Sequence, residues 1–321
     1  MEAIINSIPL SIPVIIGALI IERLLPGTSA YSPMLFFKAL GLGVSSKVHP
    51  KGRQSSAGQQ QLAGILAIII IVFPFVFLLF IMMQVVEFPY LFDALVLLIC
   101  LNWKGVRHGA QSMCKAIDKN HTNLAKARLS PWVLRQTTKL SPIGLNKGAI
   151  EMLILRASKE LFAVIFYYLC FGSLMVLSYR ILTMLNQSWN GKITHFKHFG
   201  KPCQWLCYYL EWLPSRLLAL TIMALNQFKL SFQLMAGARQ WGNDNSLFLL
   251  AATAAALKVN LGGPVIYENN KIRRPVIGNQ HTMQPQTLHV NRLLNLVDKA
   301  IVVWLLVIIL IMLMVLSLYP Q

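Results

Sequence analysis

Two long apolar runs without a single charged residue constrain this chain most. The first, LAGILAIIIIVFPFVFLLFIMMQVV, covers residues 62–86, and the second, AIVVWLLVIILIMLMVLSL, covers residues 300–318. A helix needs about 20 apolar residues to span the hydrocarbon core of a bilayer, and both runs have about that length. Pro74 is compatible with a membrane helix, because neighbouring helices can satisfy the carbonyl that it frees. The two runs therefore predict transmembrane helices.

The composition agrees with a membrane protein and argues against two other classes. Of the 321 residues, 56% are hydrophobic and only 12% are charged, whereas a soluble protein carries about 25% charged residues. The net charge of +18 could suggest a nucleic-acid binder. Lys and Arg lie mainly between the apolar blocks, however, as they do in the cytoplasmic loops of membrane proteins. No strand-like alternation is sustained, so we predict an all-α polytopic membrane protein.

Four weaker apolar segments bring the expected number of membrane-embedded helices to about 4–6. One of them is short and contains Asp93, whereas ELFAVIFYYLCFGSLMVLSY is strongly apolar. The segments are residues 4–21, 88–103, 160–179 and 205–225. We divide the chain into N-terminal membrane helices with a basic loop (1–103), a core of cytoplasmic helices and membrane-embedded segments (104–299), and a C-terminal transmembrane helix (300–321).

The charges of the loops predict the orientation in the membrane. Residues 104–159 carry eleven Lys or Arg and two acids, and residues 22–61 carry five bases and one acid. By the positive-inside rule both loops are cytoplasmic, and so are residues 226–299, with eight bases and three acids. Two crossings between them would place the basic segment 180–204 outside. We therefore favour re-entrant or interfacial helices within 160–225, beside a large basic cytoplasmic loop.

Signals for secretion, disulfides and metal binding are weak. The N-terminus MEAIINSIPLSIP lacks the basic region of a signal peptide, so we expect it to be retained. The five cysteines are odd in number and are not spaced as a disulfide framework. The segment HFKHFGKPCQWLC contains ligand types that zinc prefers, but its spacing matches no common zinc motif. We therefore assign no metal ligands, although His195, His198, Cys203 and Cys207 lie within thirteen residues.

The sequence motifs of familiar soluble enzymes, GxxxxGK[ST], GxGxxG, HExxH and GxSxG, are absent. Two other features could bind phosphate. LGGP, residues 261–264, is either a helix end at Leu261 followed by a tight loop, or a backbone phosphate site near Arg273 and Arg274. The basic loop is either a solvated face beside anionic lipid or a clamp for phosphate and carboxylate. Its central cations are Lys126, Arg128, Arg135, Lys139 and Lys147.

The stretch LEWLPSRLLAL, residues 210–220, places an acid, a proline and an arginine inside an apolar run. Ionisable residues in such runs usually pair or line a cavity. Either Pro214 bends the helix and Arg216 faces an anionic ligand, or Pro214 ends an interfacial helix and Arg216 reaches the membrane surface. Glu211 is either a displaced carboxylate or the partner of a nearby base.

Several segments in order resemble one family. LEWLPSRLLAL, AAALKVNLGGPVIY and RPVIG are similar to segments of the adenosylcobinamide-phosphate synthase family of cobalamin biosynthesis (CobD/CbiB). LAKARLSPWVLRQTTKLS, GAIEMLILRASKELFAVIFYYLCFG, and YRILTMLNQSW followed by HFKHFG resemble further family segments. The resemblance covers roughly residues 105–280.

This resemblance implies an integral protein of the bacterial inner membrane that forms an amide with ATP and Mg²⁺. It implies that adenosylcobyric acid, a corrinoid, is joined to aminopropanol or its phosphate. Other membrane enzymes of nucleotide-loop assembly are implied as partners. The resemblance assigns catalytic roles to Glu151, Arg135 and Arg216, and substrate or phosphate binding to Arg128, Gly262, Gly263, Tyr267 and Arg274.

The chain departs from the family pattern at several acids. Gln136 and Asn186 stand where the family has Asp, and Cys207 and Tyr208 stand where it has a pair of Asp. Most carboxylates that could bind Mg²⁺ are therefore missing, which leaves retained catalysis open.

Two alternatives remain. AmpE-type membrane proteins share a Glu-Arg-Leu like Glu22-Arg23-Leu24 and a Trp-x-Pro-x-Arg-Leu block, but they lack a strong LGGP segment. A non-catalytic AmpE-like sensor or scaffold is therefore the second hypothesis. A transporter would show repeats with helices broken at mid-membrane, and no repeat is visible.

Overall fold

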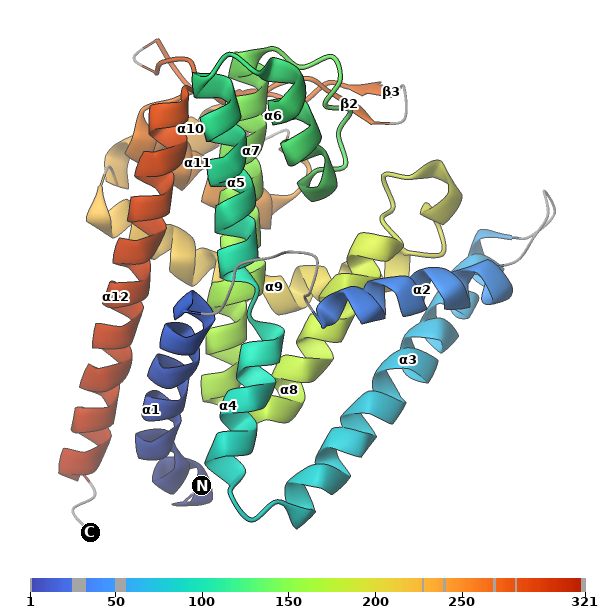
Figure 1. Ribbon diagram of the computed structural model, residues 1–321, viewed down its shortest axis with the longest axis vertical. Helices are drawn as coiled ribbons and strands as arrows, with labels where there is room; N and C mark the ends of the chain where they lie inside the picture. The colour runs from blue at the N-terminus through green and yellow to red at the C-terminus, as the bar shows by residue number, and fades with distance from the viewer. Residues whose placement is uncertain are drawn as a thin grey trace. The chain divides into compact units, whose positions relative to one another are not determined.

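The described part of the chain is almost entirely helical (Figure 1). The structure, a computed structural model, describes residues 2–24, 33–49, 56–226, 228–238, 241–267, 270–280 and 282–318. The α-helices are α1 (Glu2–Leu24), α2 (Met34–Val48), α3 (Ala57–Val85), α4 (Pro89–Cys100), α5 (Trp103–Asp118), α6 (Thr122–Leu129), α7 (Pro142–Ala157), α8 (Ala163–Ser188), α9 (Lys201–Leu225), α10 (Phe228–Gly237), α11 (Asp244–Leu257) and α12 (Thr287–Leu318). The strands are β1 (Leu261–Gly262), β2 (Val265–Tyr267), β3 (Asn270–Ile272) and β4 (Val276–Ile277), which form two short antiparallel pairs, β1 with β4 and β2 with β3. The prediction of an all-α protein is confirmed.

The chain divides into two compact units that alternate along the sequence. Unit 1 comprises Met1–Asn102 and Ala163–Glu211, and unit 2 comprises Trp103–Phe162 and Trp212–Gln321. The predicted three-part division of the sequence stays a prediction.

Four helical stretches are long and apolar enough to cross a membrane: Ala57–Val85, Pro89–Asp118, Pro142–Ser188 and Thr287–Met314. They contain most of the predicted segments 62–86, 88–103, 160–179 and 300–318. The segment 205–225 lies in α9, which is not one of them. The segment 4–21 lies in α1, where only the backbone is described before Ser11. The prediction of a polytopic membrane protein with about 4–6 embedded helices is confirmed.

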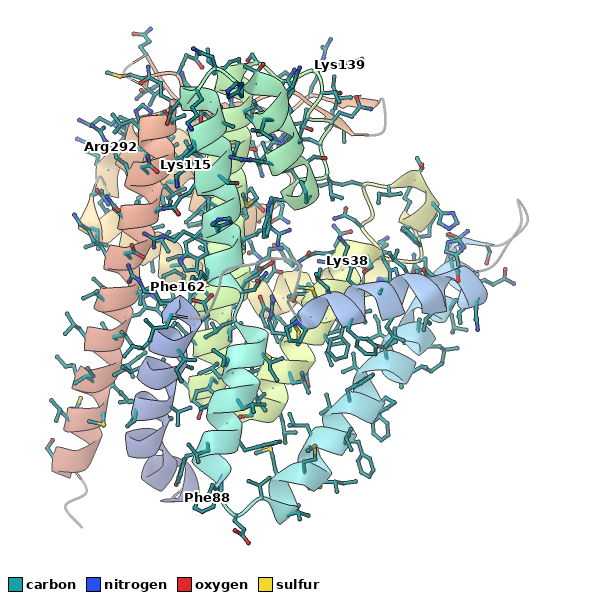
Figure 2. All side chains as sticks on the ribbon, in the orientation of Figure 1. Lys38, Phe88, Lys115, Lys139, Phe162 and Arg292 are labelled. Carbon is teal, nitrogen blue, oxygen red and sulfur yellow. The ribbon has the colours of Figure 1, made fainter. Side chains whose placement is uncertain are left out.

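Unit 1 has a polar end and an apolar end. Helix α3 begins at a capping box. The backbone N–H of Gln59 donates to Ser56 Oγ (3.2 Å), and the backbone N–H of Ser56 donates to Gln59 Oε1 (3.0 Å). Large apolar side chains along α3, such as Phe73, remain exposed, as expected for a surface that faces lipid. In Figure 2, Phe88 marks the turn between α3 and α4, and Lys38 on α2 lies at the opposite end of the unit.

Helix α8 reverses direction within unit 1. At Gly172 the backbone leaves the helical region, with φ 72° and ψ −169°. Tyr167 and Tyr179 would lie about 18 Å apart along a straight helix, yet their ring centroids are 5.0 Å apart. The two limbs form a V in Figure 1. The segment 160–179 is therefore not one straight helix, because its glycine supplies a conformation that other residues rarely adopt.

A polar contact secures this reversal. Asp93 on α4 accepts a hydrogen bond from Ser173, the first residue after the break, and one from Tyr168 Oη at 3.4 Å. The acid that weakened the prediction for 88–103 thus binds both limbs of α8. The Asp93 carboxylate thus lies at the start of the second limb of α8, where the helix dipole also favours a negative charge.

Unit 2 is built around α7, which packs against α5, α11 and α12. Ser141 caps it, because its Oγ accepts the N–H of Gly144 (3.2 Å), and Pro142 occupies the first turn. The predicted basic loop 104–159 consists mainly of the helices α5, α6 and α7. In Figure 2, Lys115, Lys139 and Arg292 lie at one end of this unit, opposite the C-terminal end of α12.

The segment after α11 corrects one expectation. Helix α11 ends at Leu257 rather than at Leu261, because Lys258 adopts the left-handed conformation (φ 55°) that closes a helix. Leu261 instead begins β1, which pairs with β4 in the register Leu261 to Ile277.

Candidate functional site

Glu151 lies at the centre of the candidate site in unit 2. It projects from the middle of α7 and is only 2% exposed. Its Oε2 accepts a hydrogen bond from Arg135 Nη2 at 2.5 Å and one from Arg274 Nη2 at 3.4 Å. Its Oε1 accepts the backbone N–H of Gly262 at 2.9 Å. A buried carboxylate is costly unless it is paired, and these three donors provide the pairing.

The two glycines of LGGP form a turn that only glycine adopts easily. Gly262 and Gly263 have φ of 73° and 84°, in the left-handed region. A Cβ on residue 262 would lie 2.6 Å from the carbonyl oxygen of Pro275 and 2.7 Å from the Trp241 ring. The N–H of Gly263 donates to Pro275 O at 3.0 Å. These contacts hold the turn so that the Gly262 N–H points at Glu151.

The two arginines reach Glu151 from different segments. Arg135 lies in the loop before α7, and this loop is tied to β2 by the bond from Gln136 N to Ile266 O (3.1 Å). Its guanidinium lies beside Gly148 on α7, 3.6 Å from the place where a Cβ of this residue would be. Arg274 precedes β4 and donates from Nε to Gly263 O at 3.2 Å. The site thus joins segments that are far apart in sequence.

Positive charge exceeds negative charge at this site. The Lys147 ammonium lies 3.5 Å from the place where a Cβ of Gly263 would be, and it interacts electrostatically with Glu151, Arg135 and Arg274. Three cations therefore surround one carboxylate. Guanidinium groups suit the bidentate geometry of phosphate and carboxylate, and glycine turns allow a ligand close to the backbone. We name the set Glu151, Arg135, Arg274, Lys147, Gly262 and Gly263 the anion cluster.

Two of the predicted site residues make other contacts. Arg128 Nη1 donates to the carbonyl oxygen of Ser112 at 2.5 Å, which joins α6 to α5. Arg216 Nη1 donates to Asn245 Oδ1 at 2.7 Å, and its guanidinium stacks between the rings of Trp212 and Phe248 at 4.3 and 5.0 Å. The backbone of Tyr267 belongs to β2, and its side chain lies outside the described residues.

The stretch LEWLPSRLLAL divides between the two units. Glu211 is the last residue of unit 1, where it is 9% exposed, and Arg216 belongs to unit 2. Helix α9 continues through Pro214 to Leu225, so the proline does not end it. The prediction that Arg216 faces an anionic ligand stays a prediction.

The His and Cys residues of HFKHFGKPCQWLC do not assemble into a metal site. The His195 ring stacks on that of His49 at 4.4 Å, and Cys203 Sγ donates to the carbonyl oxygen of Leu182 at 3.4 Å. Among the described residues, no group of three or more His, Cys, Asp or Glu could hold a metal ion.

A comparison with protein families identifies the chain. The sequence model described as "CobD/Cbib protein" matches residues 15–297. The chain belongs to the CobD/CbiB family. The match extends beyond residues 105–280 at both ends, so the first membrane helices of this CobD/CbiB chain belong to the family region as well.

Relatives of this CobD/CbiB chain carry names from cobalamin biosynthesis. A "Cobalamin biosynthesis protein CobD" of Stutzerimonas stutzeri is 26% identical over 294 residues, covering 91% of this chain and 95% of the relative. A protein of the same name from Chromobacterium violaceum is 26% identical over 289 residues, covering 89% and 92%. The "Cobalamin biosynthesis protein CbiB" of Salmonella typhimurium is 25% identical over 181 residues, covering 54% and 57%. No solved structure matches the chain.

Reasoning from the sequence named Lys147 among the basic-loop cations but missed two residues of this CobD/CbiB site. Gly148 precedes Glu151 by three positions, a spacing that places it on the same face of a helix. That spacing could have found it. Trp241, whose ring lies 4.6 Å from Arg274 Cζ, had no such signal, because 33 residues separate it from the arginine.

Proposed function

We propose that this chain forms an amide between the carboxylate of adenosylcobyric acid and aminopropanol or its phosphate, with ATP as the energy source. The observation that carries the proposal is the anion cluster of a CobD/CbiB chain, in which three cations surround one buried carboxylate. The net positive charge suits a phosphate-bearing substrate.

Each residue of the cluster has a separate role in this proposal. Arg135, Arg274 and Lys147 bind phosphate oxygens, because charge-assisted hydrogen bonds to anions are strong in partly buried sites. Glu151 does not touch the ligand; it orients both guanidinium groups through Oε2 and holds the turn through Oε1. Gly262 and Gly263 adopt the left-handed turn that brings the Gly262 N–H to Glu151.

The cations of the cluster would hold ATP through its phosphates, and when bound ATP supplies the phosphoryl group with which one carboxylate oxygen leaves as the amine forms the amide. A magnesium ion held by the protein does not fit the cluster. Both oxygens of Glu151, its only carboxylate, already accept hydrogen bonds from Arg135, Arg274 and Gly262. No step is assigned to Mg²⁺.

The location of the reaction follows from the membrane helices. The chain is a membrane protein with four helical stretches long enough to cross, and we propose the bacterial inner membrane, with the anion cluster on the cytoplasmic side. The charge bias supports this side, since the turn between α3 and α4 contains Glu87 and no base, and residues 104–159 contain eleven bases. Other membrane enzymes of nucleotide-loop assembly are proposed as partners, since they share the corrinoid.

The test is genetic and is completed with purified protein. A deletion strain able to import corrinoids should fail to grow on cobyric acid and should grow on cobinamide. Plasmid-borne wild-type protein should restore growth on cobyric acid. Unimpaired growth of the deletion strain on cobyric acid, in the absence of a second copy of this family, would contradict the proposal.

A non-catalytic role, as in an AmpE-like sensor or scaffold, is the second candidate. It is favoured by the departures at Gln136, Asn186, Cys207 and Tyr208, which remove acids. If purified protein binds a corrinoid but consumes no ATP when the corrinoid and amine are present, the chain is a binding protein. If it also fails to bind a corrinoid, the scaffold hypothesis is correct.

A further inference from the structure

Trp241 lies beside the anion cluster and has no role in the function proposed above. Its ring centroid is 4.6 Å from Arg274 Cζ, within the range of a cation–π contact. The same ring would be 2.7 Å from a Cβ on residue 262. Trp241 therefore contacts both an arginine of the cluster and the turn that binds Glu151.

The hydrogen bonds of Arg274 alone would hold it loosely. Its Nε donates to Gly263 O at 3.2 Å, the upper end of the usual range for an N–H···O bond, and its Nη2 donates to Glu151 Oε2 at 3.4 Å, which is beyond that range. The guanidinium also lies over the Trp241 ring, which gives it a third contact besides the two hydrogen bonds. A group held by three contacts from different residues has fewer orientations open to it than one held by two.

The other arginine of the cluster is held differently. Arg135 makes a 2.5 Å bond to Glu151 and lies over Gly148. Among the described residues, Arg274 lies over an aromatic ring, that of Trp241, and Arg135 does not. The ring should thus matter more for Arg274, whose guanidinium has five N–H donors, of which two are used in these bonds.

We infer that Trp241 is a positioning residue that holds Arg274 with its remaining donors toward a phosphate oxygen of the substrate. It also fits against the Gly262 backbone and so keeps the turn aligned with Glu151. The inference rests on the proposed function. Its ligand chemistry is a phosphate group, which can belong to ATP or to aminopropanol phosphate.

The experiment compares Trp241→Leu, Trp241→Phe and Trp205→Leu in the full-length protein. The leucine removes the ring at position 241, whereas the phenylalanine keeps an aromatic face. Trp205 is the matched control, because its ring also lies near a cation, Lys201 Nζ at 5.3 Å, but belongs to unit 1 and is 60% exposed. Three quantities are measured: the Kd for inorganic phosphate, the KM values for ATP and aminopropanol phosphate, and the melting temperature.

Trp241→Leu should weaken phosphate binding by about 5- to 30-fold, the range given by a partly desolvated cation–π contact. It should raise one of the two KM values by a similar factor with little change in kcat. The KM that rises identifies the molecule whose phosphate Arg274 contacts. Trp241→Phe should retain most of the affinity, and Trp205→Leu should match the wild type.

Two outcomes would overturn the inference. One is unchanged phosphate affinity and unchanged KM values in Trp241→Leu, which leaves the proposed function standing. The other is equal loss in the leucine and phenylalanine variants together with an equal fall in melting temperature, which would make Trp241 a packing residue. Wild-type protein that binds no phosphate would contradict the proposed function itself, and the inference with it.

Discussion

Units 1 and 2 both contain an acid inside a helix, and the two acids have opposite surroundings. In unit 1, Asp93 is bound by two neutral hydroxyl donors, Ser173 and Tyr168. In unit 2, Glu151 is bound by two guanidinium groups and a backbone N–H. The first arrangement joins the two limbs of α8 to α4. The second leaves net positive charge, because cations outnumber the carboxylate, and only this one is suited to bind an anion.

The role of an acid in an apolar run therefore depends on its partners. Hydroxyl partners indicate a structural role, whereas cationic partners that outnumber the acid indicate a ligand site. Substitutions at Glu151, Gly262, Arg216 and Gly172 should therefore affect the two units differently.

Glu151→Gln should cause the largest loss. It leaves Arg135, Arg274 and Lys147 without their counter-charge, and breaking a buried ion pair costs about 3–5 kcal/mol. The control is Asp298→Asn, whose pair with Arg107 at 2.7 Å is more exposed, at 28% and 23% of the side chains, and should cost about 1 kcal/mol or less. The free energy of unfolding in detergent measures both. Equal losses in the free energy of unfolding would show that the Glu151 ion pairs stabilise the protein no more than an exposed pair does.

Gly262→Ala should cost about 2–4 kcal/mol, from the left-handed backbone and from the clash with Pro275 O. Gly242→Ala separates the two causes, because Gly242 has φ 82° but nothing within 4 Å of its would-be Cβ. The control should therefore cost only about 1–2 kcal/mol. Chemical unfolding of both variants gives the difference, and a difference near zero would argue against the close packing of the turn.

Arg216→Ala should abolish most of the amide-forming activity, and Arg216→Lys should restore little. The planar guanidinium stacks between Trp212 and Phe248 while it binds Asn245, and an ammonium cannot do both. A hydrogen bond to a charged group contributes about 1.5–3 kcal/mol, so kcat/KM should fall roughly 10- to 150-fold. Near-normal kcat/KM in the lysine variant would show that position 216 requires only a positive charge and not the planar guanidinium.

Gly172→Ala should cost about 1–2 kcal/mol in unit 1 with kcat unchanged, because its φ of 72° disfavours a side chain while the space around it is open. Gly17→Ala on α1 is the matched control: it also has open space, but no left-handed backbone. The control should be neutral or stabilising, since alanine favours helices. If Gly172→Ala raises the melting temperature or leaves it unchanged, as Gly17→Ala should, the left-handed backbone at Gly172 would be contradicted.

Some features of the fold could be read from the sequence because they are local. The uncharged runs 62–86 and 300–318 predicted the apolar helices α3 and α12. The reversal of α8 was not predicted as such, because a single glycine in an apolar run does not distinguish a kink, a reversal and a straight helix.

The site was partly predictable for a different reason. Glu151, Arg135, Arg274 and the glycine pair entered through a family resemblance, and the structure brings these five together. Their geometry depends on tertiary contacts between segments more than 100 residues apart, as in the bond from Gly262 to Glu151, and no local pattern reports those contacts.

The reversal of α8 has a consequence for how the chain is made. Because its limbs meet at Gly172, the polypeptide enters and leaves the apolar part of unit 1 at the same end. A re-entrant α8 of this kind would keep the four Lys and Arg residues of 180–204 on the side from which the helix enters. Lys and Arg accumulate in cytoplasmic loops, so one glycine would bring the topology of α8 into agreement with the charge of the segment that follows it.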